Sequence, residues 1–262
     1  MTTTPAGSPA TPRQKLLLLD FDGTVCLGDD PVLHYAAQVD ALLAERGRTA
    51  HDDGGVRAVV AGALAAGDLQ VPAPPEGTPA QDGYQLVQRL GRARGLSAEE
   101  TGVAFRAGRE ALLAVGLQRS DVHAPAGLAA LLAEIRPAAA VVLVTNSPAT
   151  AFAPWLEALG LTGAFDAVVN DAGKPAGLPA ALEAALEEAR RGAGVEHIAE
   201  TQVLSIGDIW ENDLAPVAAR GGTTVLIDRF AAGIGSPDHR VPDLAAAAPI
   251  LRDWAAAPDA DV

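Results

Sequence analysis

A run of leucines with two carboxylates directly behind it constrains the fold of this chain more than any other feature. Residues 16–24 read LLLLDFDGT, which places Asp20 and Asp22 one residue apart. A short apolar run bounded by polar residues is typical of a strand that is covered on both faces. Two carboxylates this close repel each other unless a cation or a proton lies between them. The stretch therefore predicts a buried strand that delivers two acidic groups to a cation.

Four later segments also favour strands, and helical periodicity separates them. They read AAAVVLVTNS, FDAVVND, TQVLSIGD and GGTTVLID, in that order. Strands that alternate with helices imply right-handed crossovers and a parallel sheet. We therefore expect an α/β fold built on a Rossmann-like, doubly wound parallel sheet.

The region between the first strand and the second carries helical patterns and no convincing strand. Asp30-Pro31 looks like an N-cap followed by a proline in the first turn of a helix. The prolines of residues 71–81 indicate a loop, because proline cannot sustain a helix. The other helical patterns cover about 55–66, 82–94 and 97–115.

These patterns predict a core with one insertion. We expect an all-helical domain to interrupt the α/β core after its first strand, and a disordered leader to precede the core. The expected boundaries are 1–14 for the leader, 15–29 and 124–256 for the core, and 30–123 for the helical domain.

Composition excludes some partners. The formal net charge is -14, and such a surface repels both nucleic acid and anionic membranes. No stretch approaches the length of apolar sequence that a membrane span needs.

The single cysteine, Cys26, allows no internal disulfide and fits a reducing cytoplasm. The oligomeric state, monomer or dimer, is left open.

Polar groups follow several of the predicted strands, at the edge where α/β sheets bind their ligands. Carboxylates together with one lysine and one hydroxyl suit a hard divalent cation and a phosphoryl group. The candidate residues are Asp20, Asp22, Thr145, Asn146, Ser147, Lys174, Asp208 and Asp213.

The motifs DFDGT, LVTNS, GKP and IGDIWEND occur in this order between residues 15 and 230. In this arrangement the chain resembles the haloacid dehalogenase superfamily, in which phosphatases dominate. The helical region is similar to the C1 cap that this family inserts after its first strand. The resemblance implies a phosphatase that acts on a small phosphorylated metabolite with Mg²⁺ as its cofactor.

The resemblance also implies roles for the acidic residues. Asp20 would be the nucleophile that forms an aspartyl-phosphate, and Asp22 would be the general acid and base. Mg²⁺ would be held by the carboxylates of Asp20 and Asp208 and by the backbone carbonyl of Asp22, with Asp213 in support. An acid at position 22 favours phosphoryl chemistry over halide displacement, since a halide leaves without a proton.

The remaining motif residues would bind the phosphoryl group. Thr145 and the backbone amide of Asn146 would donate hydrogen bonds to its oxygens, and Lys174 would neutralise it together with Asp20. Gly23 suits a tight turn beside the phosphate. Arg106 and Arg109 in the helical region could meet an anionic substrate tail or lie on a solvated helix face.

Two alternatives to a phosphatase are considered. A phosphotransferase or phosphomutase of the same superfamily would pass the phosphoryl group from Asp20 to another hydroxyl. A non-hydrolytic phosphate-binding module, such as a receiver domain, also combines acidic residues with a threonine and a lysine. Receiver domains are about half as long and lack a helical insertion, which disfavours the second alternative.

Overall fold

The computed structural model describes residues 14–48, 54–70, 79–193 and 198–258. The predicted leader, except for Gln14, lies outside the described residues, as does most of the predicted loop at 71–81. Within the described ranges, no helix combines the length and the apolar character needed to cross a bilayer.

A six-stranded parallel sheet in the order β3-β2-β1-β4-β5-β6 forms the centre of the fold. The chain begins at a central strand, builds outward to one edge and then crosses to the other, which confirms the predicted doubly wound α/β fold. The strands are β1 (Lys15–Leu19), β2 (Ala139–Val144), β3 (Ala167–Val169), β4 (Val203–Gly207), β5 (Thr223–Ile227) and β6 (His239–Val241).

Helices cover both faces of this sheet, which explains the four leucines of β1. Successive side chains of a strand point to opposite faces. Leu17 and Leu19 pack with α5 and α9 on one face, and Leu16 and Leu18 pack with α7 and α8 on the other. The helices of the core are α5 (Leu128–Ile135), α6 (Ala153–Ala158), α7 (Leu178–Ala193), α8 (Ala215–Ala218) and α9 (Leu244–Ala256).

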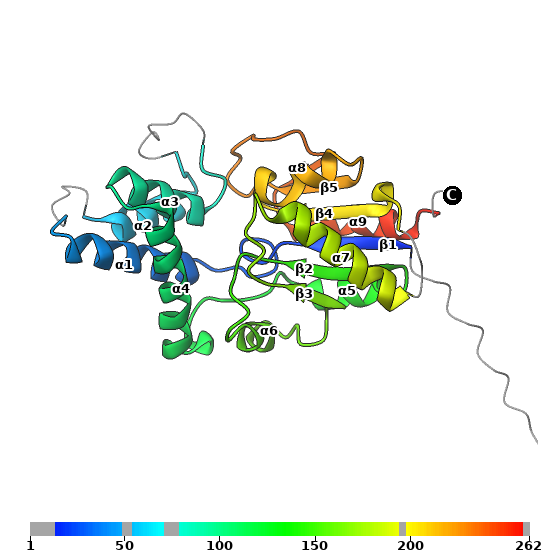
Figure 1. Ribbon diagram of the computed structural model, residues 1–262, viewed down its shortest axis with the longest axis horizontal. Helices are drawn as coiled ribbons and strands as arrows, with labels where there is room; N and C mark the ends of the chain where they lie inside the picture. The colour runs from blue at the N-terminus through cyan, green and yellow to red at the C-terminus, as the bar shows by residue number, and fades with distance from the viewer. Residues whose placement is uncertain (1–13, 49–53, 71–78, 194–197, 259–262) are drawn as a thin grey trace, which may run out of the picture.

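The inserted region forms a separate group of helices at one end of the sheet (Figure 1). Its described residues contain no strand, as predicted. The helices pack around a hydrophobic cluster of their own, to which Val39, Val60 and Val87 contribute. They are α1 (Asp30–Glu45), α2 (Val56–Ala66), α3 (Gly83–Ala93) and α4 (Ala98–Val115), and a 3₁₀ turn follows at Leu117–Arg119.

Helix α4 belongs to both parts of the molecule. Its Ala104 lies in the hydrophobic cluster of the helical region, whereas Leu112 lies in the cluster beneath the sheet. Where the chain leaves the core and returns to it, Leu27 and His123 exchange two backbone hydrogen bonds of 2.9 and 3.1 Å. The two connections between the core and the helical region are therefore hydrogen-bonded to each other.

The start of α1 differs from the expected cap. Asp29 occupies the N-cap position, but its side chain makes no capping hydrogen bond to the backbone of the helix. The carboxylate of Asp121, from the returning connection, accepts hydrogen bonds from the backbone N–H groups of Asp29 at 2.7 Å and Asp30 at 3.0 Å. The prediction that Asp30 caps this helix was wrong, because the capping carboxylate comes from a residue distant in sequence.

We expect Gly108→Ala to lower the free energy of unfolding by about 1–3 kcal/mol, because it overpacks the contact between α4 and α1. The added methyl carbon would lie 2.8 Å from the backbone nitrogen and Cα of Tyr35. In the matched change Gly62→Ala, the methyl group meets nothing within 4 Å. That variant should gain up to about 1 kcal/mol, since alanine favours helix more than glycine does.

Urea unfolding of both variants measures these differences. A Gly108→Ala protein as stable as wild type would contradict the close approach of α1 and α4.

Candidate active site

A cavity of about 460 Å³ lies between the helical region and the ends of the core strands. Asp20, Thr145, Lys174 and Asp208 all line it, although they come from four different segments. The helical region closes the other side of the cavity. The predicted residues therefore converge on one site, as the carboxyl ends of parallel strands should.

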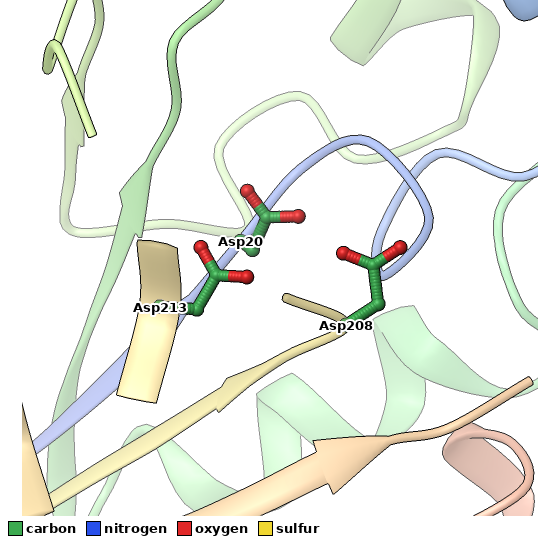
Figure 2. A group of neighbouring side chains, drawn as sticks. All are labelled: Asp20, Asp208 and Asp213. Atoms are coloured by element: carbon green, nitrogen blue, oxygen red, sulfur yellow. The ribbon is translucent and has the colours of Figure 1, made fainter. Parts of the chain in front are cut away.

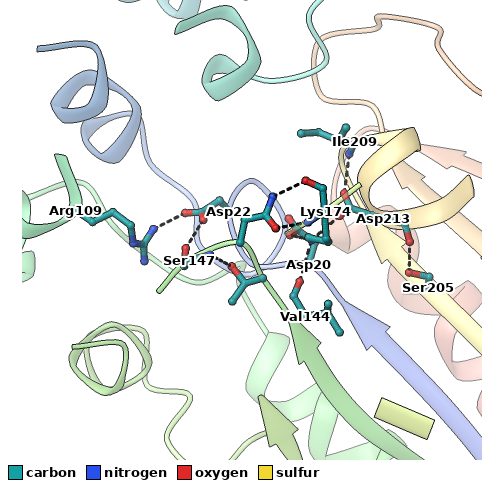
Figure 3. Close-up of polar contacts among 11 residues, drawn as sticks. Asp20, Asp22, Arg109, Val144, Ser147, Lys174, Ser205, Ile209 and Asp213 are labelled. Atoms are coloured by element: carbon teal, nitrogen blue, oxygen red, sulfur yellow. Dashed lines mark hydrogen bonds and ion pairs between the residues drawn. The ribbon is translucent and has the colours of Figure 1, made fainter. Parts of the chain in front are cut away.

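Lys174 is the centre of the polar contacts in this cavity (Figure 3). Its Nζ lies 2.6 Å from Asp20 Oδ1 and 2.6 Å from Asp213 Oδ1, and it donates to the carbonyl oxygen of Val144 at 2.9 Å. Burial of Lys174 opposes its charge, but attraction to Asp20 and Asp213 outweighs burial and raises its pKa. The ammonium group therefore stays charged and holds these carboxylates together.

Asp20, Asp208 and Asp213 form a cluster that could hold a metal ion (Figure 2). One carboxylate oxygen of each lies within 4.8 Å of the other two. Oδ1 of Asp208 is buried and has no hydrogen-bond partner among the described residues. Together with the neighbouring carboxylate oxygens of Asp20 and Asp213, this oxygen forms a set of donors of the kind that a hard divalent cation binds.

The loop after β1 can approach Asp208 only because residue 23 is glycine. Gly23 has a φ of +87°, and a Cβ atom there would lie 2.0 Å from Asp208 Oδ2. Any other residue would be strained and would displace this carboxylate. Gly23 thus shapes the acidic cluster, while its predicted place beside a phosphate stays a prediction.

The negative charges of the site are incompletely compensated. Burial, followed by repulsion from Asp213, raises the pKa of Asp20 to about 8 although Lys174 opposes this shift. Burial and the nearby Asp82 raise the pKa of Asp208 well above its ordinary value. Asp82, at the start of α3, has a pKa raised to about 7, chiefly by burial. Lys174 alone therefore does not neutralise the cluster.

Asn146, in the segment after β2, forms hydrogen bonds that hold the loop carrying Lys174 in place. The side chain of Asn146 donates to the carbonyl oxygen of Lys174 at 3.0 Å and accepts from its backbone N–H at 2.7 Å. This contact was not predicted, and it fixes the loop that carries Lys174. Thr145 is buried, and its Oγ1 accepts a hydrogen bond from the backbone N–H of Ser147 at 3.0 Å. The hydroxyl proton of Thr145 is left to donate into the cavity.

Asp213 lies in a π-helical turn at Trp210–Leu214, which continues directly into α8. Its Oδ2 accepts a hydrogen bond from the backbone N–H of Ile209 at 3.0 Å, and its other oxygen contacts Lys174. Both oxygens of Asp213 thus have partners, unlike those of Asp208. Wider turns of this kind often lie at functional sites.

The side chain of Asp22 points away from the acidic cluster. Its Oδ1 accepts hydrogen bonds from Arg109 Nη1 at 2.9 Å and from the hydroxyl of Tyr84 at 3.1 Å. Its Oδ2 accepts from the hydroxyl of Ser147 at 2.9 Å. Burial and the charge of Asp22 raise the pKa of Tyr84 well above its ordinary value, so this hydroxyl remains a donor.

The two arginines of α4 differ in their surroundings. Arg106 lines the cavity, as a residue that meets substrate would. Arg109 is buried with an exposed fraction of 5% and pairs with Asp22, so the expectation of a solvated face is wrong for it. One signal was present in the sequence, since Arg109 lies in helical register with Phe105 and Leu112. A cation on an apolar helix stripe indicates a buried anionic partner.

Comparisons with known proteins agree with the fold. The model of the haloacid dehalogenase-like hydrolase family matches residues 14–221. Among solved structures, the chain is similar to a haloacid dehalogenase-like family hydrolase from Xanthomonas campestris, with 19% identity, a TM-score of 0.53 and 97% of each chain covered. No curated protein matches the sequence.

Two further structures have the same fold. One is a predicted phosphoglycolate phosphatase from Haemophilus somnus, with 16% identity, a TM-score of 0.56 and coverage of 91% of this chain and 98% of that chain. The other is a haloacid dehalogenase-like hydrolase from Streptococcus pneumoniae, with 15% identity, a TM-score of 0.53 and coverage of 90% and 98%. At these identities the similarity establishes the fold alone.

We expect Asp20→Asn to raise the free energy of unfolding of the metal-free protein, and the gain to grow between about pH 5 and pH 8. Asp20 has a pKa of about 8 in the folded protein against an ordinary value of 3.8. The folded protein therefore binds a proton that the unfolded chain has released, and wild type loses stability as rising pH removes that proton.

Urea unfolding in EDTA across this pH range measures the difference between the variant and wild type. Asp253→Asn, an exposed change on α9, is the control and should follow wild type at every pH. A stability difference for Asp20→Asn that does not change with pH would contradict the raised pKa.

Proposed function

Because the chain belongs to the haloacid dehalogenase-like hydrolases, whose family model matches residues 14–221, we propose that it is a Mg²⁺-dependent phosphatase. Its substrate would be a small phosphorylated metabolite, and the reaction would proceed through an aspartyl-phosphate at Asp20. The observation that carries this proposal is the contact of Asp20 with the Lys174 ammonium at 2.6 Å, beside the unpartnered oxygen of Asp208.

Asp20 is proposed as the nucleophile. A carboxylate attacks a phosphate ester poorly, since like charges must approach, and Lys174 offsets this repulsion from its position on Asp20 Oδ1. The bond from Asp20 to phosphorus would form as the bond to the leaving oxygen breaks. Thr145 and the backbone amide of Asn146 would hold the phosphoryl oxygens in the cavity during this exchange.

Asp22 is proposed as the group that moves protons. It would give a proton to the leaving oxygen in the first step. In the second step it would take a proton from the water that attacks the aspartyl-phosphate, which releases inorganic phosphate and restores Asp20. The two steps together consume one water and leave every residue unchanged.

The residues present fit a magnesium ion. The carboxylates of Asp20 and Asp208 and the backbone carbonyl of Asp22 would hold it, as oxygen donors of the kind that Mg²⁺ prefers. When bound, the ion supplies positive charge that neutralises the phosphoryl group and the acidic cluster. We propose that Asp213 acts beside it by holding Lys174, because both of its oxygens already have partners.

The cavity supports a small substrate. Its volume of about 460 Å³ must hold both the phosphoryl group and the leaving group. Arg106 and the amide side chains of Gln85 and Gln88 line the part formed by the helical region, and they would suit a polar or acidic leaving group. Short phosphorylated acids are therefore the first compounds to test, and a structural neighbour described as a predicted phosphoglycolate phosphatase agrees with this choice.

We expect Asp20→Asn to reduce kcat/KM for phosphate release by at least about 10³-fold, since an amide cannot replace the carboxylate that would form the covalent intermediate. Wild type, Asp20→Asn and the exposed control Asp253→Asn would be tested with Mg²⁺ against a panel of small phosphate esters. The control should retain wild-type turnover. Substantial hydrolysis by Asp20→Asn would contradict the role of Asp20.

Removal of divalent cations by EDTA should abolish phosphate release, and Mg²⁺ should restore it. The same assays separate the alternatives. Conversion of one phosphate ester into its isomer without release of phosphate would indicate a mutase. Binding of phosphate esters without turnover would indicate a non-hydrolytic module.

A further inference from the structure

The carboxylate of Asp22 accepts hydrogen bonds from residues that lie outside its own loop. Figure 3 shows Arg109 and Ser147 directed toward it from different elements. Arg109 and Tyr84 belong to the helical region and contact Oδ1 at 2.9 and 3.1 Å, whereas Ser147 follows β2 and contacts Oδ2 at 2.9 Å. The orientation of this carboxylate therefore depends on how the helical region lies against the core.

Arg109 is itself fixed in place. Its guanidinium carbon lies 3.8 Å from the centre of the Trp155 ring, with the rings of Phe21 at 5.5 Å and Phe105 at 5.8 Å. Such packing suits a planar cation and would not suit a lysine. Its Nη2 is buried and makes no hydrogen bond with any described residue. The pair thus joins a buried guanidinium to a partly buried carboxylate, so that loss of Asp22 would leave a buried charge without its partner.

Among the described residues, Arg109 is not one of those that line the cavity, whereas Asp22 and Tyr84 are. Arg106, one helical turn before Arg109, also lines it. Any effect of Arg109 on the reaction is therefore indirect, and Asp22 is the cavity-lining residue with which it forms an ion pair.

We propose that Arg109, assisted by Tyr84, is a positioning residue that aims the Asp22 carboxylate for its proton transfers. This inference rests on the proposed phosphatase function. A guanidinium can only donate hydrogen bonds, so Arg109 fixes Oδ1 as an acceptor. The hydroxyl of Ser147 can donate or accept, which leaves Oδ2 as the oxygen that gives the proton to the leaving group and later takes one from water. The helical region would thereby take part in the chemistry as well as enclosing the substrate.

Leaving-group dependence tests this role. Substituted phenyl phosphates of nearly equal size differ chiefly in how much their leaving oxygen needs a proton. We expect Arg109→Met to reduce kcat/KM by about 10²-fold for phenyl phosphate, which needs general acid catalysis, and by only about 3-fold for p-nitrophenyl phosphate. A plot of log kcat/KM against leaving-group pKa should therefore be steeper for the variant than for wild type.

Two further variants separate positioning from structural support. Tyr84→Phe keeps the ring that packs against Tyr35 and Phe105 and removes one donor to Asp22, so it should fold and steepen the plot to a smaller extent. Val60→Ala removes buried side-chain atoms from the cluster of the helical region. It should lower stability and leave the slope unchanged.

The outcomes are distinct. Slopes equal to wild type for folded Arg109→Met, or for Tyr84→Phe if Arg109→Met does not fold, would overturn the positioning role and leave the phosphatase proposal intact. A wild-type protein that hydrolyses none of these esters in Mg²⁺ would overturn the proposed function and this inference with it.

Discussion

The contact of the Lys174 ammonium with Asp20 and Asp213 is the interaction on which the rest of the site depends. Buried charges persist only when they are paired and hydrogen-bonded. Lys174 meets both conditions, and by also donating to the carbonyl oxygen of Val144 it joins the end of β2 to the segments that follow β1 and β4. Because one ammonium cannot neutralise this cluster, the oxygen of Asp208 that lacks a partner is where a further cation would be most strongly attracted.

A second cation, Arg109, lies on the other side of the loop that carries Asp20 and Asp22. Lys174 comes from the core and contacts Asp20, whereas Arg109 comes from the helical region and contacts Asp22. Because residues of α4 pack in the hydrophobic clusters of both regions, this helix can couple the position of the helical region to the orientation of Asp22. The two acidic residues of the DFDGT motif are therefore oriented by different parts of the molecule, which matches the different tasks proposed for them.

Much of this arrangement could be predicted, because the signals involved are local in sequence. The leucines before Asp20 predicted a central strand, and β1 is buried on both faces. The polar groups after each strand predicted convergence of Asp20, Thr145, Lys174 and Asp208, since parallel strands direct their carboxyl ends to one edge. The short strand β6 had no such signal, since two of its three residues are exposed and polar.

The sequence by itself determined the parallel sheet, the helical insertion and the set of acidic residues at the sheet edge, because each strand, helix and motif is encoded by a few neighbouring residues. Only the tertiary structure decided which partner each charge would have. Asp121 caps α1 in place of Asp30, and Arg109 pairs with Asp22 from 87 residues away. Such pairings depend on distances in space, and a charged residue in a sequence does not specify which opposite charge will be buried beside it.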